Sequence, residues 1–362
     1  MRTIRSFIEE SIEAGACPGA VWIVGDREKI LEQGTAGVLG EGLGPVQSDS
    51  IYDFASITKI FTTLTLMREL EDGLLRLSDT IGYFMPEWQR RNYNKADIPL
   101  LEIVTHSSPI DTLLDIYYVA RTKQDLLDGI LRSPLRKDNA SMVQYTCDAY
   151  ILLGEIIAHI EGTTLDEAVR RRVIEPLGMT DTGYLPPAQL LDRIAPTEFS
   201  EWRGGIMTRG QVHDENAVIM GGVSGNAGIF GPASSLAKIA AMMLNAPAAA
   251  NGHTHSSTSF LHPATIAMMT KCCTEGRNKD SQRRGIGWLM NGPGAPAGDL
   301  MTENSYGHTG YTGTSIWIDP VYGLYGVLLS NRVHPTRANT KFFRVRSVFH
   351  NLIVLNYSQG GS

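Results

Sequence analysis

Strand patterns at the two opposite ends of the chain constrain the fold more than any other feature of the sequence. Near each end, two apolar or β-branched runs flank a short turn, which is the pattern of a β-hairpin. A helical pattern precedes the first hairpin and another closes the chain. Because both ends have the same α/β character, the economical arrangement is one discontinuous sheet domain made from both of them. The predicted helices and strands cover residues 3–14, 20–24, 29–33, 314–318, 324–329 and 340–355.

The stretch between the two ends is mainly helical. Apolar side chains repeat on one helical face over residues 60–70, and Gly73 ends that helix. Residues 149–160 are strongly apolar, and residues 164–167 (Thr-Leu-Asp-Glu) are a capping box for a helix that runs to Ile174. We therefore predict an α/β (α+β) fold in which terminal helices flank an antiparallel sheet and a mainly helical domain is inserted.

These patterns divide the chain into two predicted domains. Residues 1–55 and 275–362 form the sheet domain, and residues 56–274 form the mainly helical domain, with the active site expected between them. A chain of 362 residues with 43% hydrophobic content is long enough to bury a substantial core. Two stretches, 247–259 and 291–299, are rich in small, polar or turn-forming residues and are predicted to be surface loops.

Composition and charge favour a small-molecule partner. The net charge of -6 comes from acidic and basic residues mixed along the chain, so nothing indicates nucleic acid or an anionic membrane surface as a partner. The first ten residues lack the apolar stretch of a secretion signal, and no later run approaches membrane-spanning length. The cysteines have neither zinc-site spacing nor a disulfide framework, so we expect reduced thiols, a cytoplasmic protein and no metal or other cofactor. The four cysteines are Cys17, Cys147, Cys272 and Cys273.

A serine and a lysine three residues apart, Ser56 and Lys59, open the first long helix of the middle stretch. On a helix this spacing puts both side chains on one face, and the positive end of the helix dipole favours an activated nucleophile there. The pattern alone is weak evidence, because a chain of this length contains it by chance. A second copy, Ser235 and Lys238, follows a Gly-Pro-Ala sequence, and Ser234 or Ser235 is better interpreted as a helix N-cap.

Two further motifs follow Ser56 in a fixed order. Residues 145–147 (Tyr-Thr-Cys) precede the apolar helix, and residues 308–310 (His-Thr-Gly) precede a predicted strand. Together with residues 52–59 and 175–184, they resemble the class C β-lactamase-related serine hydrolases, a superfamily that includes penicillin-binding proteins, family VIII esterases, cytosolic amidases and acyltransferases. The resemblance covers most of the chain and implies a β-lactamase/transpeptidase-like fold. The segments that look closest to the cytosolic amidase branch are 212–217, 221–228 and 331–335.

The resemblance implies a role for each motif residue. Ser56 is the expected nucleophile, Lys59 its activating partner and Tyr145 the expected general base. A tyrosine has an ordinary pKa near ~10, so it acts as a base at neutral pH only if a cation favours its phenolate or if it relays a proton to Lys59. His308 completes the predicted catalytic set, and the backbone N–H groups of Ser56 and Tyr311 are expected to form the oxyanion hole.

Several positions depart from the family pattern and limit the prediction of the substrate. Cys147 stands where relatives often have Asn, and a thiol is a weaker partner for a substrate amide. His308 replaces the lysine of the penicillin-binding versions, which removes a permanent cation and argues against penicillin as the main substrate. Asn226 stands where the cytosolic branch usually has His, and residues 105–109 also differ. The residues predicted to contact substrate are Cys147, Asn226, Thr309 and Gly310.

Each assignment also has a purely structural alternative. Ser56 could cap a helix, Tyr145 could be a packing residue, and His308 could be a satisfied histidine at a strand end. Residues 213–215 (His-Asp-Glu) lack the spacing of metal ligands and are better interpreted as a structural turn. The sequence contains no Gly-x-Ser-x-Gly motif, which argues against an α/β-hydrolase.

We expect a small ester or amide substrate whose acyl group is transferred to Ser56 and then released. If water releases it, the protein is an amidase or esterase, as most relatives are hydrolases. If an amine or alcohol accepts it, the protein is an ATP-independent transacylase of the kind found in natural-product biosynthesis. A non-turnover sensor that remains acylated is the third and weakest alternative.

Overall fold

The centre of the molecule is a six-stranded antiparallel sheet to which both ends of the chain contribute. The computed structural model describes residues 2–91, 93–112, 116–137, 142–250, 259–277 and 282–358. The strands are β1 (Gly19–Asp26), β2 (Ile30–Gly37), β8 (Leu289–Met290), β9 (Tyr306–Thr309), β10 (Ser315–Asp319) and β11 (Leu324–Ser330). Their order is β2-β1-β11-β10-β9-β8, and Ala20 of β1 lies opposite Ser330 of β11. The two predicted hairpins are confirmed, and they join each other directly in one sheet.

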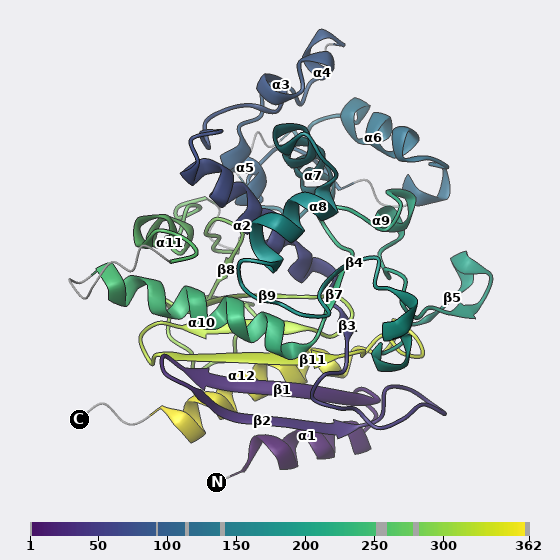
Figure 1. Cartoon of the computed structure of the whole chain (residues 1–362), viewed down its shortest axis with the longest axis vertical. Coiled ribbons are helices and arrows are strands. Elements are labelled where there is room, and N and C mark those ends of the chain that lie inside the picture. Colours follow the sequence, from purple (N-terminus) through teal and green to yellow (C-terminus); the bar gives the residue numbers. More distant parts are fainter. Residues whose placement is uncertain are drawn as a thin grey trace.

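Alternate side chains of β1 face two different layers of helices. Trp22 packs in the core formed with α1 (Ile4–Glu13) and α12 (Phe342–Tyr357), whereas Ile23 joins the core that includes α10 (Ala233–Ala250). This separation follows because successive side chains of a strand point to opposite faces of the sheet. Figure 1 shows α1 and α12 on one side of the sheet and α10 on the other. The terminal helices therefore flank the sheet as predicted.

The remaining helices form a mainly helical part, drawn above α10 and the sheet in Figure 1. Its central helices, α2 (Thr58–Glu71) and α7 (Asp148–Glu161), pack against each other through buried apolar side chains. Both were predicted from their apolar patterns. α7 ends at Gly162, whose left-handed conformation closes the helix. The other helices are α3 (Ile81–Phe84), α4 (Pro86–Arg90), α5 (Leu100–Val104), α6 (Lys123–Arg132), α8 (Leu165–Val169), α9 (Glu215–Ile219) and α11 (Pro263–Met269).

Two short sheets lie outside the six-stranded sheet. One contains three strands in the order β3-β7-β4, and the other pairs β5 with β6. These strands are β3 (Tyr52–Asp53), β4 (Gly183–Tyr184), β5 (Phe199–Ser200), β6 (Ile206–Met207) and β7 (Ile229–Gly231). Because β3 immediately precedes the Ser56 turn, its pairing with β7 fixes the direction from which the chain enters that turn.

The predicted capping box at residues 164–167 is not formed. Thr164 is the N-cap of α8, but its side chain makes no capping hydrogen bond. The Glu167 carboxylate instead accepts a hydrogen bond from Arg170 Nε at 2.9 Å, so it is not available to the N-cap backbone. The helix continues to Ile174 as predicted, but through a π-helical turn (Arg170–Ile174).

The second Ser-x-x-Lys pair has a structural role, as predicted, although not as an N-cap. α10 begins at Ala233, so Ser235 lies within the first turn of the helix. Its hydroxyl is buried and lies 2.7 Å from Thr182 Oγ1, while Lys238 donates to the backbone carbonyl of Gly178. Ser235 and Lys238 therefore each form a hydrogen bond with a different residue.

The predicted loops are partly confirmed. Residues 291–299 contain neither helix nor strand, as expected. The loop predicted at 247–259 begins too early, because α10 continues to Ala250, and residues 251–258 lie outside the described part of the chain. The domain boundaries stay a prediction. α10, which falls within the predicted helical domain, packs against β1, β10 and β11.

Glu69 is a buried acid on α2. Both of its carboxyl oxygens are buried and have no hydrogen-bond partner among the described residues. Burial, together with the nearby Glu161, raises the pKa of Glu69 to about 9. An unfolded chain has a Glu pKa near ~4.3, so between these values the folded state keeps a proton that the unfolded state has lost. Folding stability from this group therefore falls as the pH rises through this window.

Replacing Glu69 with Gln should stabilise the protein at pH 8 far more than at pH 5. Gln is neutral in both states, so the variant removes a cost of roughly 5 kcal/mol at pH 8 and about 1 kcal/mol at pH 5. Urea unfolding at the two pH values measures the difference. The exposed Glu13→Gln variant is the control and should show no such pH dependence. An equal gain at both pH values would contradict the buried, protonated Glu69.

Candidate active site

Ser56 lies at the start of the central helix α2. It is the middle residue of a 3-10 turn, η1 (Ala55–Ile57), that continues into α2. The preceding Ala55 has a φ of 47°, which is uncommon for a residue with a side chain. Its backbone N–H donates to Asp53 Oδ1 at 2.8 Å, and this contact helps to hold the unusual turn. Ser56, the predicted nucleophile, therefore lies on a constrained segment between a strand and a helix.

Lys59, one helical turn after Ser56, has a fully buried side chain. Its Nζ atom lies 3.1 Å from Ser56 Oγ, 3.0 Å from the Asn226 carbonyl oxygen and 3.5 Å from Cys147 Sγ. Burial by itself lowers the pKa of Lys59, but Cys147 and Tyr145 together outweigh it and raise the pKa above its usual value. Lys59 is therefore a cation at neutral pH, within hydrogen-bond distance of the predicted nucleophile Ser56 Oγ.

Tyr145 packs over the Lys59 ammonium, with 4.8 Å between Nζ and the ring centroid. Its hydroxyl oxygen is buried on the side of Lys59 and Ser56, both of which favour its charged form. Burial raises the pKa of Tyr145, and Lys59 opposes this shift without reversing it. The His106 ring also packs against Tyr145, with 4.6 Å between the two ring centroids. Tyr145 is thus protonated at rest, which favours a proton relay through its hydroxyl over a resident phenolate.

Two threonine hydroxyls hold the chain after β9 against the nucleophile segment. Thr312 Oγ1 donates to the Asp53 carbonyl at 2.7 Å, and Thr314 Oγ1 donates to the Phe54 carbonyl at 3.0 Å. A Cβ atom on Gly310 would lie 2.0 Å from Thr314 Oγ1 and 2.3 Å from Phe54 O. Only glycine fits at this position. We call these contacts of residues 310, 312 and 314 with residues 53 and 54 the threonine latch.

The threonine latch brings Tyr311 to the same cavity as Ser56. Among the described residues the Tyr311 N–H makes no hydrogen bond. Arg332 fixes the residue, because its Nε donates to the Tyr311 carbonyl at 2.9 Å and its guanidinium lies 4.5 Å from the ring centroid. The His213 ring stacks on the phenol at 5.7 Å. A fixed backbone with a free donor suits an oxyanion hole, and that role of Tyr311 and Ser56 stays a prediction.

His308 is a neutral imidazole in the cavity wall. Its Nδ1 lies 2.9 Å from the Thr309 carbonyl oxygen, which can only accept, so Nδ1 carries the proton and Nε2 has the lone pair. Nε2 is buried and has no partner within the described part of the chain. Burial lowers the pKa of His308 to about 3, and the cations of Arg284 and Lys59 add to this effect. A hydrogen-bond acceptor therefore stands where β-lactamases have a lysine.

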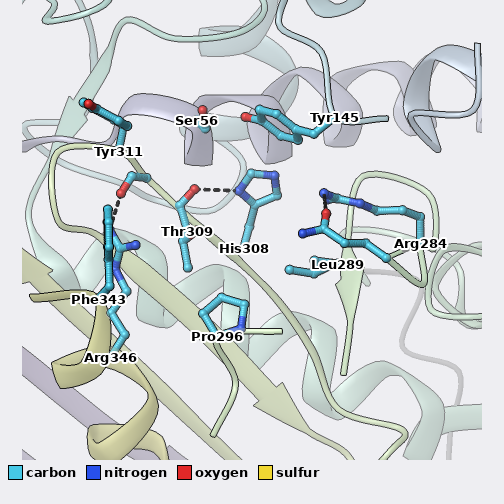
Figure 2. A pocket seen from close by; sticks show the side chains of 12 residues that line it. Ser56, Tyr145, Arg284, Leu289, Pro296, His308, Thr309, Tyr311, Phe343 and Arg346 are labelled. Atoms are coloured by element: carbon cyan, nitrogen blue, oxygen red, sulfur yellow. Dashed lines mark hydrogen bonds between the residues drawn. The ribbon is translucent and has the colours of Figure 1, made fainter. Parts of the chain in front are cut away.

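A cavity of about 360 Å³ opens beside Ser56 and His308 (Figure 2). This size suits a small-molecule site. Figure 2 shows Ser56 next to Tyr145, with Tyr311 on one side of this pair and Arg284 on the other. The cavity is lined by Ser56, Tyr145, Gln282, Arg284, Leu289, Pro296, His308, Thr309, Gly310, Tyr311, Phe343 and Arg346. Most of the predicted site residues are thus brought together on one wall.

Cys147 and Asn226, which were predicted to contact substrate, do not line this cavity. Both contact the Lys59 ammonium instead, and Asn226 has no exposed surface. The reason is the close packing of the preceding Gly225 on α7, where a Cβ atom would lie 2.1 Å from the Tyr150 carbonyl oxygen. This packing holds Asn226 next to Lys59 Nζ. The contacts of Cys147 and Asn226 with Nζ indicate that these two residues position the lysine side chain.

Two arginines of the cavity were not predicted. Arg284 and Arg346 are both buried, and neither forms an ion pair with a carboxylate in the described ranges. Burial lowers their pKa values, to about 10 for Arg284 and about 9 for Arg346, and both remain charged at neutral pH. Arg346 follows Phe342 and Val345 on the buried face of the predicted C-terminal helix, which was an available signal. No motif or periodicity marks Arg284.

The described residues contain neither a cluster of metal ligands nor a helix that could span a membrane. Within them, no group of three or more His, Cys, Asp or Glu side chains is placed to hold a metal ion. Asp214 caps α9 by accepting from Ala217 N at 2.8 Å, which confirms residues 213–215 as a structural turn. None of the described helices has both the length and the apolar character needed to cross a membrane.

The fold and the arrangement of Ser56, Lys59 and Tyr145 are those of a β-lactamase/transpeptidase-like serine hydrolase. The sequence profile of the Beta-lactamase family matches residues 4–348, and the chain belongs to this family. The family prediction from three ordered motifs is therefore confirmed.

Proteins with different named activities are similar to this chain in sequence or in structure. A "Putative D-alanyl-D-alanine carboxypeptidase" from Salmonella agona (strain SL483) is 30% identical over 327 residues, which cover 81% of this chain and 72% of that protein. The structure of a penicillin-binding protein homologue from Caulobacter crescentus has a TM-score of 0.72 at 18% identity and covers 96% of both chains. That of "EstCE1, a hydrolase with promiscuous acyltransferase activity" has a TM-score of 0.71 at 18% identity, over 95% of this chain and 97% of the other.

The His308 imidazole should stay neutral, with its proton on Nδ1, between pH 5 and pH 8. A long-range ¹H–¹⁵N spectrum of the histidine rings, recorded across this range, tests the tautomer and the absence of titration. The signal is assigned by its loss in His308→Gln. Titration of that signal near pH 6.5 would show that the burial argument is wrong.

Replacing Gly310 with Ala should slow acylation of Ser56 by about 100-fold or more, because displacing an oxyanion donor costs this much. The added Cβ would push the chain away from Phe54 and carry the Tyr311 N–H with it. Stopped-flow kinetics with an activated ester measures the effect. Gly44→Ala is the matched control, since no atom lies within 4 Å of the added Cβ there. Acylation at the normal rate in Gly310→Ala would contradict the role of the threonine latch.

Proposed function

We propose that this protein is a serine acyl-enzyme hydrolase, an amidase or esterase that cleaves a small ester or amide through a covalent Ser56 intermediate. The observation that carries the proposal is the 3.1 Å contact between Ser56 Oγ and the buried Lys59 ammonium at the wall of a small-molecule cavity. Family membership supports the chemistry, because the relatives include a carboxypeptidase and a hydrolase by name.

Acylation follows from the placement of the groups. Ser56 Oγ attacks the carbonyl carbon while its proton passes to Tyr145 Oη, and the oxyanion is held by the N–H groups of Ser56 and Tyr311. The bond from the acyl carbon to the leaving oxygen or nitrogen then breaks, and the phenol proton of Tyr145 moves to that atom. Because Tyr145 and Lys59 are both protonated at rest, Tyr145 gives up its own proton as it receives the serine proton, and Lys59 stays a cation.

Deacylation repeats these steps with water as the nucleophile. Water adds to the acyl carbon while its proton passes to Tyr145 Oη. The phenol proton of Tyr145 moves to Ser56 Oγ as the bond from the acyl carbon to that oxygen breaks, which releases the acid and restores the serine. His308 Nε2, which has a free lone pair in the cavity, can accept a hydrogen bond from the incoming nucleophile. An amine or alcohol in place of water would make the protein a transacylase. This second candidate is supported by the fold shared with a hydrolase of promiscuous acyltransferase activity.

The setting of the activity is part of the proposal. A small-molecule ester or amide is the substrate, and an amine is the acceptor in the alternative reaction. All four cysteines are free, which suits a reducing cytoplasm.

Incubation with an activated ester should acylate Ser56, and peptide mass analysis locates the label. Ser56→Ala should abolish both labelling and turnover. Ser235→Ala is the matched control, because it removes the serine of the second Ser-x-x-Lys pair, which lies away from the cavity, and it should leave labelling intact. Label at another residue, or normal turnover in Ser56→Ala, would refute the proposal.

The fate of the label separates the alternatives. Release by water alone supports the hydrolase. Release accelerated by an added amine, with formation of the amide product, supports the transacylase. A stable adduct that is released by neither would support the non-turnover sensor.

A further inference from the structure

The peptide group between Gly310 and Tyr311 has a cation on its carbonyl side. The Gly310 carbonyl oxygen accepts hydrogen bonds from the Arg346 guanidinium and, at 3.2 Å, from the Gly313 N–H. This peptide bond is trans, so its carbonyl and its N–H point in opposite directions. The N–H belongs to Tyr311 and is the expected oxyanion donor. Arg346 therefore binds the opposite end of the peptide group that contains this donor.

Arg346 reaches the Gly310 carbonyl from helix α12. Its side chain is buried, and its guanidinium lies 5.7 Å and 5.8 Å from the ring centroids of Phe342 and Phe343. Figure 2 shows Ser56 and Tyr311 at the top of the site and Arg346 below them. No carboxylate pairs with this guanidinium in the described part of the chain. The cation therefore faces a backbone carbonyl in place of an acidic side chain.

The charge of Arg346 is costly to bury, because no opposite charge replaces the hydration that it loses. Burial and the nearby Arg332 lower the pKa of Arg346 to about 9, so it remains a cation at neutral pH. A neutral side chain of similar size could support the turn after β9 without this cost. The positive charge itself therefore requires an explanation.

A cation on a carbonyl oxygen strengthens the N–H of the same peptide group. It draws electrons toward the oxygen, and the resonance of the peptide bond leaves the N–H more positive. The negative end of the peptide dipole then faces the cation, and the positive end faces the forming oxyanion. Screening is weak in a buried site. The gain is greatest in the transition state, when the substrate oxygen carries the negative charge.

Arg332 makes a similar contact one peptide group later. Its Nε donates to the Tyr311 carbonyl at 2.9 Å, and its guanidinium lies 4.5 Å from the ring centroid of Phe343. That carbonyl belongs to the peptide group shared with Thr312, whose N–H is not the expected oxyanion donor. Arg332 therefore holds Tyr311 in place, whereas Arg346 contacts the peptide group of the donor itself.

We infer that Arg346 is a positioning residue of the oxyanion hole, and that its positive charge strengthens the Tyr311 N–H through the Gly310–Tyr311 peptide group. The inference rests on the proposed Ser56 chemistry. As the bond from Ser56 Oγ to the acyl carbon forms, the electron pair of the carbonyl bond moves to its oxygen, and it returns when the leaving group departs. Arg346 neither gains nor loses a proton, and it acts without touching the substrate.

Chemical rescue tests the role of the charge. The donor is 4-nitrophenyl phenylacetate, which is neutral, so an effect of Arg346 on it cannot come from binding an anionic group. Arg346→Ala should slow the burst of nitrophenolate by roughly 10-fold, less than the ~100-fold expected for loss of the donor itself. Dilute guanidinium chloride should restore much of the rate from the cavity side, whereas urea, which has a similar shape and no charge, should not.

Arg344→Ala is the matched control for this experiment. Arg344 lies on the same helix as Arg346, but its side chain is exposed and it does not line the cavity. The burst rate of this variant should equal that of the unmodified protein, and guanidinium should not raise it.

The infrared stretch of the acyl carbonyl reports the strength of the oxyanion contacts directly. An isotope label at the carbonyl carbon of the donor separates this band from those of the protein. The band should move to higher frequency in Arg346→Ala and return when guanidinium is added. If the alanine variant does not fold, Arg346→Lys and Arg346→Gln give the same comparison. Lysine keeps the charge, so its variant should have the lower carbonyl frequency and the faster burst.

Other results would overturn the inference. Rescue by urea as effective as rescue by guanidinium would show that Arg346 only fills space. A normal burst rate in Arg346→Ala, or no rescue together with equal rates and frequencies in the Lys and Gln variants, would exclude a role of the charge. Failure of the proposed function looks different. If the unmodified protein shows no burst and no acylated Ser56, the covalent chemistry is wrong, whereas Ser56 acylation that is independent of Arg346 refutes only this inference.

Discussion

The threonine latch is the interaction on which the site depends. It joins the end of β9 in the sheet to the segment that precedes Ser56, and these two segments are about 260 residues apart in the chain (Thr312 Oγ1 to the Asp53 carbonyl). The missing side chain of Gly310 lets the two backbones approach closely enough for the hydroxyls to reach. The alignment of the Ser56 turn with the Tyr311 N–H is therefore set by backbone contacts, which tolerate almost no change in side-chain volume.

Three of the charged side chains that lie buried near the cavity are cations. Lys59, Arg284 and Arg346 are all buried near the cavity, and no carboxylate among the described residues pairs with them. Burial keeps the nearby His308 neutral, since its pKa is lowered to about 3. Such a site attracts anions and stabilises the oxyanion that forms during acyl transfer.

Much of the fold and part of the site could be predicted from the sequence. The hairpins and the helices α2 and α7 carry strong apolar patterns, and the ordered motifs locate Ser56, Tyr145 and His308. The placement of Asn226 beneath Lys59 could not be predicted, because it depends on how closely a glycine loop packs against α7. Arg284 also gave no signal, since its place in the cavity and its lack of an acidic partner among the described residues depend on packing in space, about which sequence periodicity carries no information.

The histidine in the third motif and the arginine outside it are physically linked. A lysine at position 308 would place a third permanent cation beside Lys59 and Arg284, and each added buried charge of the same sign raises the cost of the others. A neutral imidazole avoids this cost while keeping a polar group at the cavity wall. The cation that β-lactamases carry on this strand is thus absent, and Arg284 supplies a positive charge from a different segment, next to Tyr145. In the described part of the cavity wall, the positive charge is therefore carried beside Tyr145 by Arg284, while position 308 carries a neutral imidazole.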